Sequence, residues 1–107
     1  MISSIELIYR HKLFYERLCN ATVADRKVFF SLAHDITDFL QNNDYRLFDF
    51  IMEPSNIDHY DPQIMMTLLR YSLKVKDQIP NWEPFRDNAK KYFKENGLYN
   101  DRIFYGL

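Results

Sequence analysis

The stretch DPQIMMTLLRYSLKV, residues 61–75, decides the fold of this chain. It opens with Asp61, a residue type that caps helix N-termini, and Pro62, the residue type favoured at the first helical position. The apolar residues that follow cover more than half of a helical wheel and leave only a narrow polar strip. A helix that is apolar over most of its circumference must be covered by other elements, so we expect it at the centre of a helical bundle.

Helical periodicity on both sides of this stretch predicts four further helices. They are expected at about 4–19, at 22–41 with Thr22 as N-cap, at about 44–52, and at about 81–96 with Asn81 as N-cap. Pro54 ends the third helix and Pro80 ends the central one, while residues 53–61 form the only long polar connection. Asn100 and Gly106 predict a final turn closed by Leu107.

The composition favours one all-α domain over residues 1–107, a compact bundle of about five helices plus a short C-terminal helical turn. The 107 residues are 47% hydrophobic and 27% charged, as is ordinary for a globular chain, and two glycines leave little means of making β-hairpins. The single cysteine, Cys19, and the absence of a signal segment indicate a cytoplasmic protein. No apolar stretch approaches the length of a membrane span.

Aromatic residues are unusually frequent, at 17% of the chain. One interpretation is a core built from aromatic rings. The other is a recognition surface, because Tyr and Trp combine apolar area with a polar tip.

Charge is distributed unevenly along a chain whose net charge is −1. Between residues 28 and 69 the only base is Arg46, whereas the acids are Asp35, Asp38, Asp44, Asp49, Glu53, Asp58 and Asp61. This acidic run is either a solvated face that keeps the protein soluble or a surface that attracts a basic groove on a partner. The C-terminal part is basic, but acids are interleaved with its lysines, so nucleic acid is not favoured as a partner.

The segment SLAHDITDFL, residues 31–40, raises the question of a metal site. The order His11, then His34 and Asp35, then Asp58 or Asp61 resembles the His, His-Asp, Asp order of the HD family of metal-dependent hydrolases, which are all-helical. That resemblance implies that these side chains converge on a metal ion in the bundle.

Helical wheels argue against such convergence. His34 points away from the apolar arc of its helix, which predicts an exposed side chain with Asp38 one turn further on. His11 falls inside the apolar stripe of its helix, where we expect it to donate to a backbone carbonyl. We therefore predict no catalytic residue, no metal ligand and no cofactor.

The sequence favours a non-enzymatic protein-protein interaction module, such as an adaptor, inhibitor or regulator, whose partner is another protein or a second copy of the chain. Its abundant Asn, Lys, Ile, Tyr and Phe would also fit a mobile element. The predicted contact surface combines the seven acids of the acidic run with Met65, Met66, Leu69 and Leu73 of the central helix. A small HD-like hydrolase and a nucleic-acid-associated regulator are the two alternatives.

Overall fold

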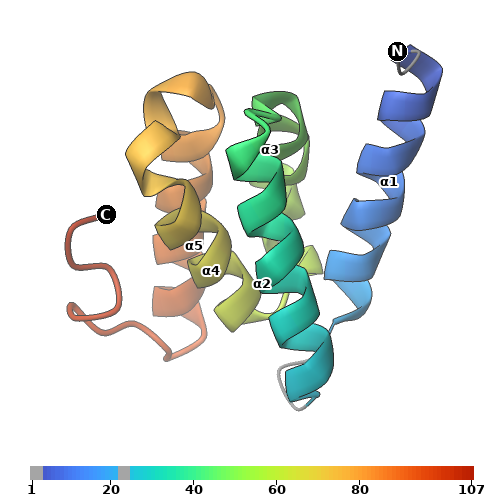
Figure 1. Ribbon diagram of the computed structural model, residues 1–107. Coiled ribbons are helices and arrows are strands. Elements are labelled where there is room, and N and C mark those ends of the chain that lie inside the picture. The colour runs from blue at the N-terminus through green and yellow to red at the C-terminus, as the bar shows by residue number, and fades with distance from the viewer. Residues whose placement is uncertain (1–3, 22–24) are drawn as a thin grey trace.

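The computed structural model describes residues 4–21 and 25–107, which form α-helices, two 3₁₀ helices and no strand (Figure 1). The elements are α1 (Ser4–Asn20), α2 (Arg26–Gln41), α3 (Tyr45–Ile51), η1 (Pro54–His59), α4 (Pro62–Ser72), η2 (Leu73–Gln78) and α5 (Trp82–Glu95). The predicted all-α bundle is confirmed. In Figure 1, α1 lies on one flank of the molecule and the C-terminal segment on the other.

Helix α4 begins where the sequence predicts. The Asp61 carboxylate accepts a hydrogen bond from the Gln63 amide at 2.9 Å, and Pro62 occupies the first helical turn. The buried side of the helix packs against α2 and α5 and carries Ile64, Met65, Leu68 and Leu69. The α-helix ends earlier than predicted, at Ser72, and the chain continues to Gln78 as η2 with a kink at Val75.

The N-terminus of α2 differs from the prediction. Helix α2 begins at Arg26, and its N-cap is Asp25, whose carboxylate accepts a hydrogen bond from the Val28 amide at 3.3 Å. The predicted cap, Thr22, lies outside the described residues. The helix can begin after Asp25 because this carboxylate accepts a hydrogen bond from an amide in the first turn, which has no partner within the helix.

The connection between α3 and α4 is more regular than predicted. Residues Pro54–His59 form a 3₁₀ turn, with the Asn56 amide bonded to the Glu53 carbonyl at 2.9 Å. The Tyr60 hydroxyl then donates to the Ile51 carbonyl at 2.7 Å. These bonds fold the connection back onto the end of α3 and bury Ile57 in the core.

One apolar cluster joins all five α-helices and reaches Phe104 in the C-terminal segment. Its largest fully buried side chains include Trp82, Phe48 and Phe85, so aromatic rings do build much of the core. Other rings lie on the surface, Tyr105 with 82% of its area exposed. In the described part of the chain no helix has the length and apolar character needed to cross a bilayer.

The start of α5 is fixed by α3. Asn81 occupies the N-cap position, as predicted, but its side chain donates to the Asp49 carbonyl at 2.8 Å instead of capping its own helix. The Asp49 carboxylate accepts from the Asn81 amide at 3.0 Å. This reciprocal pair orients α5 against α3.

A buried polar contact joins α4 to α5. Trp82 Nε1 donates to the Ser72 hydroxyl at 3.0 Å, and that hydroxyl donates to the Leu68 carbonyl. Both Ser72 and Trp82 are fully buried, so neither group has access to water. The hydroxyl therefore satisfies an indole N–H that would otherwise lack a partner.

Replacing Ser72 with alanine removes this acceptor and leaves the Trp82 N–H buried and unpaired. We expect Ser72→Ala to lower the free energy of unfolding by about 1–3 kcal/mol. Urea denaturation followed by the fluorescence of the single tryptophan measures the change. Thr67→Ala is the matched control, because the Thr67 hydroxyl bonds to the carbonyl four residues back, as Ser72 does, but no buried donor depends on it. Equal losses of stability in the two variants would contradict the assignment.

Candidate protein-binding site

A groove of about 510 Å³ opens between the start of α4, the end of α5 and the segment that follows α5. Its lining residues are Asp61, Pro62, Gln63, Met66, Phe93, Leu98 and Ile103. Most of these side chains are apolar, and Leu98 is 44% exposed at the mouth. An apolar concavity with a few polar groups at its edge is typical of a site that receives an apolar side chain.

Each wall of the groove belongs to a different part of the chain. Met66 lies one turn into α4 and is half-buried, beside the fully buried Met65. After α5, Gly97 adopts a positive φ of 68°, which turns the chain so that the Leu98 amide bonds to the Phe93 carbonyl at 2.8 Å. This helix C-terminus places Leu98 opposite α4.

The C-terminal segment that forms the third wall is fixed to the bundle. Arg70 on α4 donates to the Ile103 carbonyl at 2.5 Å, and Arg86 on α5 donates to the Leu107 carbonyl at 2.7 Å. The Phe104 ring packs edge-on against Phe93 at 5.2 Å between centroids. The predicted final turn is confirmed, since the Asn100 side chain accepts from the Arg102 amide and Gly106 has a φ of 80°.

Charged groups of both signs lie at or near the groove. Asp61 lines it, whereas Asp58 and Glu95 line a separate hollow of about 250 Å³. The nearby base, Lys91, already lies 3.9 Å from Glu95. Asp61 therefore supplies a negative charge at the groove, while Arg70, which donates to the Ile103 carbonyl, places a positive charge beside its wall.

Three carboxylates of the acidic run serve the fold. Asp44 caps α3 by accepting from the Leu47 amide, Asp61 caps α4, and Asp49 holds the N-terminus of α5. Sequence reasoning assigned only Asp61 to a cap. Glu53 is exposed and lines a hollow of about 520 Å³ beside Asp49.

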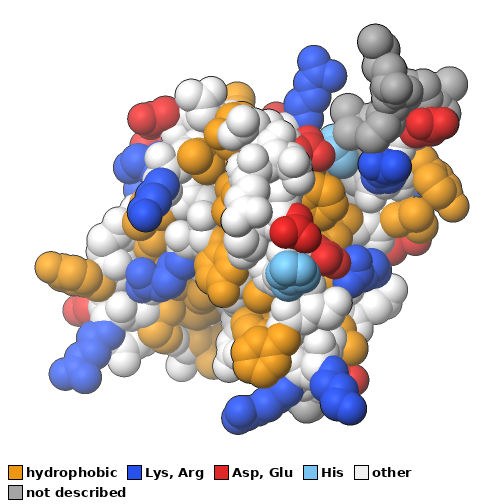
Figure 2. Space-filling view, viewed as in Figure 1, with side chains coloured by type: hydrophobic (Ala, Val, Ile, Leu, Met, Phe, Trp, Pro, Cys, Tyr) orange, Lys and Arg blue, Asp and Glu red, His pale blue; other side chains and the backbone are white. Residues whose placement is uncertain are grey.

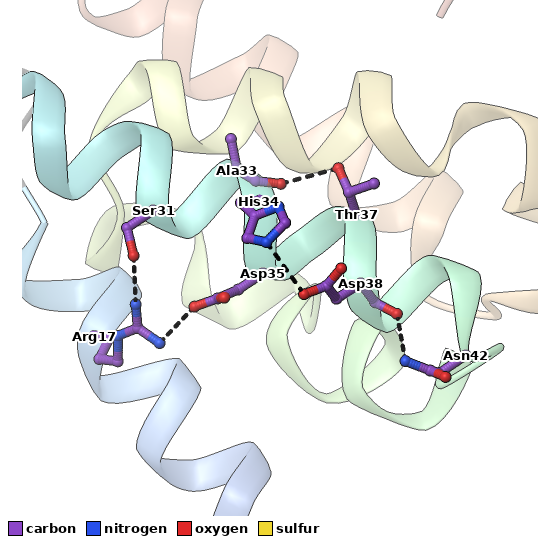
Figure 3. Close-up of polar contacts among 8 residues, drawn as sticks. All are labelled: Arg17, Ser31, Ala33, His34, Asp35, Thr37, Asp38 and Asn42. Carbon is purple, nitrogen blue, oxygen red and sulfur yellow. Dashed lines mark hydrogen bonds and ion pairs between the residues drawn. The ribbon is translucent and has the colours of Figure 1, made fainter.

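The remaining acids of SLAHDITDFL face two directions (Figure 3). Asp35 points toward α1, where Arg17 Nη1 donates to its carboxylate at 2.7 Å. His34 points away from the bundle toward Asp38, with 3.6 Å between Nε2 and Oδ2. Figure 2 shows a histidine beside acidic side chains on the outer surface over α2. The predicted exposed pair of His34 and Asp38 is confirmed.

His11 is buried, as predicted, but its partner differs from the prediction. The imidazole Nε2 lies 3.1 Å from Asp44 Oδ2, so it bonds a carboxylate and not a backbone carbonyl. Only one oxygen of the Asp44 carboxylate caps α3, so the other oxygen can bond His11. The contact ties α1 to the start of α3.

The residues in HD-like order have separate partners. His11 bonds Asp44 on α3, His34 faces Asp38 on its own helix, and Asp58 lies 3.6 Å from His59. Among residues 4–21 and 25–107, no group of three or more His, Cys, Asp or Glu side chains is placed to hold a metal ion. The resemblance to HD hydrolases therefore stops at the order of the residues.

Two of the four apolar residues that were predicted to contact a partner lie inside the core instead. Met65 and Leu69 have no exposed area and belong to the core, because they occupy the side of α4 that packs against α2 and α5. Met66 and Leu73 are half-buried at the edge of the core. Of the four, Met66 alone lines the groove.

An aromatic cluster that sequence reasoning missed attaches α1 to η1. The Tyr15 hydroxyl lies 2.6 Å from His59 Nδ1, and its ring meets Phe50 and Tyr60 edge-on. A proton on His59 Nε2, which faces Asp58, leaves Nδ1 free to accept from Tyr15.

Burial and a hydrogen bond with Cys19 raise the pKa of Tyr15 from 10.0 to about 12. Burial also raises the pKa of Tyr60 well above its usual value.

Comparison of this chain with protein-family models, with curated proteins and with solved structures finds no match. No relative transfers a function to the groove, to the acidic residues or to the aromatic cluster. The function is therefore argued from the chemistry of these sites alone.

The raised pKa of Tyr15 predicts a loss of stability in alkali. Below pH 10 both states keep the phenol protonated; between about pH 10 and 12 the unfolded chain releases this proton and the folded chain keeps it. The free energy of unfolding should therefore fall as pH rises through this window. Urea denaturation at a series of pH values should show a shallower decline for Tyr15→Phe.

The matched control is Tyr105→Phe, which removes a hydroxyl from a ring that is almost fully exposed. Its pH dependence should equal that of the wild type. A Tyr15→Phe variant whose stability declines as steeply as the wild type would contradict the role given to Tyr15.

Proposed function

We propose that this chain is a non-enzymatic protein-interaction module whose groove between α4, α5 and residues 98–103 receives an apolar side chain of a partner protein. The observation that carries the proposal is the groove itself, with a volume of about 510 Å³ and walls of Met66, Phe93, Leu98 and Ile103. A methionine in the wall suits this role, because its flexible, polarizable side chain adapts to different apolar groups.

The rigidity of the walls supports binding in this groove. Phe93 is anchored in the core, and the segment that carries Ile103 is held by Arg70 and by the packing of Phe104. A groove that exists before the partner arrives costs little conformational entropy on binding. We therefore expect the partner, and not this chain, to become ordered.

The charge at the mouth narrows the chemistry of the partner. Asp61 lines the groove, whereas Arg70, beside its wall, is engaged with the Ile103 carbonyl. A partner segment that carries Lys or Arg next to its apolar anchor complements this charge. In this proposal the acidic run contributes to recognition through Asp61, while Asp44 and Asp49 serve the fold.

Selection from a random peptide library against the full-length chain tests the proposal. We expect the selected peptides to share one large apolar residue beside Lys or Arg. Met66→Glu places a carboxylate in the wall of the groove and should weaken binding of these peptides at least about tenfold, because an apolar anchor would then contact a desolvated charge. Fluorescence anisotropy with a labelled peptide measures the loss.

Tyr71→Glu is the matched control, since it adds the same charge at an exposed position of the same helix that does not line the groove. It should leave the affinity within about twofold of the wild type. Peptides that bind the Met66→Glu variant as tightly as the wild type, or a selection that enriches no shared motif, would overturn the proposal.

A further inference from the structure

The outer face of α2 carries an aligned set of exposed side chains. Phe30, His34 and Asp38 follow each other at intervals of four residues, so they lie on one side of the helix. Phe30 is 64% exposed, and the side chains of His34 and Asp38 are 75% and 51% exposed. Leu32 and Ile36, on the opposite side of α2, are buried in the core. Phe30, His34 and Asp38 therefore lie on the solvent-facing side of the helix.

The separation of the two polar groups matches the geometry of a metal site. His34 Nε2 and Asp38 Oδ2 lie 3.6 Å apart, which is long for a hydrogen bond. Two ligand atoms bound to one tetrahedral zinc, each at about 2.0–2.1 Å from the metal, are about 3.4 Å from each other. The pair therefore approaches the spacing of two zinc ligands with both side chains already on one turn of helix (Figure 3).

One copy of the chain supplies only half of such a site. A stable zinc site has four ligands, or three and a water, and no described group of His, Cys, Asp and Glu reaches three. Asp35, the acid next to His34, is held by Arg17 on the α1 side of the helix. The missing ligands must therefore come from outside the chain.

We propose that His34 and Asp38 from two copies of this chain bind one zinc ion, and that the metal joins the copies through the outer faces of their α2 helices. A two-fold axis through the ion supplies two imidazole nitrogens and two carboxylate oxygens, a complete tetrahedral set. The side chain of Phe30, one turn before His34, then lies at the edge of the contact and contributes apolar area on both sides.

Charge makes this pairing depend on the metal. Without zinc, the contact would bring two Asp38 carboxylates together, and their repulsion opposes association. A divalent cation between them neutralises both charges. The ligand set favours zinc over magnesium, because magnesium prefers oxygen ligands and this site offers two imidazole nitrogens.

The other exposed histidine is a less suitable ligand. His59 Nε2 also lies 3.6 Å from a carboxylate, that of Asp58. Its ring, however, packs beside Tyr15 of α1, and its side chain is only 46% exposed. His59 is therefore the less exposed of the two histidines and provides an internal control.

The proposal is independent of the groove, because no residue of the α2 face lines it. A zinc-joined pair would present two grooves, and a partner with two binding segments would then gain avidity. A failure of peptide binding would not contradict the metal site, and a failure of zinc-dependent dimerisation would not contradict the groove.

Native mass spectrometry and light scattering of the full-length chain, titrated with zinc chloride, test the proposal. We expect a zinc-dependent dimer with one zinc ion per two chains, and no dimer with magnesium chloride. His34→Ala and Asp38→Ala should each raise the zinc concentration needed for half-maximal dimer at least about tenfold. Both positions are exposed, and circular dichroism verifies that the variants keep their helices.

His59→Ala should dimerise with zinc as the wild type does. Phe30→Ala should weaken the dimer and keep its stoichiometry of one metal ion per two chains. A chain that stays monomeric with zinc, a dimer that is unchanged in His34→Ala, or a dimer lost in His59→Ala would each overturn the proposal.

Discussion

The hydrogen bond from Trp82 to Ser72 is the central polar contact of the bundle. It joins α4 to α5 inside the core, where an unpaired N–H would be costly, so the two helices can pack in only one register. Lys76 and Arg86 lie over the Trp82 ring, at 5.4 Å and 5.6 Å from its centroid. Arg86 in turn holds Leu107. Arg86 thereby links the packing of Trp82 to the C-terminal segment, which Arg70 and the Phe93 ring also hold.

The groove is a consequence of this arrangement. Helix α4 buries one side against α2 and α5, and Met66 lies half-buried at the edge of the core, where it forms part of the groove wall. The turn at Gly97 returns the chain along α5 and supplies the opposite wall. Core packing and recognition thus use adjacent residues of one helix, Met65 for the first and Met66 for the second.

Local sequence signals predicted the helix starts and turns that depend on residues close together in the chain. Asp61 with Pro62, the periodic apolar residues and Gly106 located α4, the bundle and the final turn, because each acts within a few residues of itself. The early end of α4 was not predictable in this way. The change to a 3₁₀ helix after Ser72 accompanies the contact with Trp82, ten residues further on. The cap of α2 was misassigned because Thr22 and Asp25 are both good caps three residues apart.

The site was predicted less well than the fold, for a related reason. The acidic run was visible in the sequence, but Asp49 bonds Asn81 and Asp44 bonds His11, each more than 30 residues away. The cap that Asp44 makes on α3 is local, through the Leu47 amide three residues on, and was missed. Periodicity placed Met66 on an apolar face, yet Leu98 and Ile103 gave no indication that they would meet it. The exposed pair of His34 and Asp38 was predictable, because both residues belong to one helix and the wheel alone decides where they point.

The groove is a fixed part of the fold, with the C-terminal segment as a permanent wall. Amide hydrogen exchange on the full-length chain measures how permanent this wall is. We expect slow exchange for the Leu98 and Ile103 amides, which bond the Phe93 and Asn100 carbonyls, along with the amides in the middle of α4 and α5. Rapid exchange of residues 98–107 while α4 and α5 stay protected would contradict it, since the groove would then lack a wall.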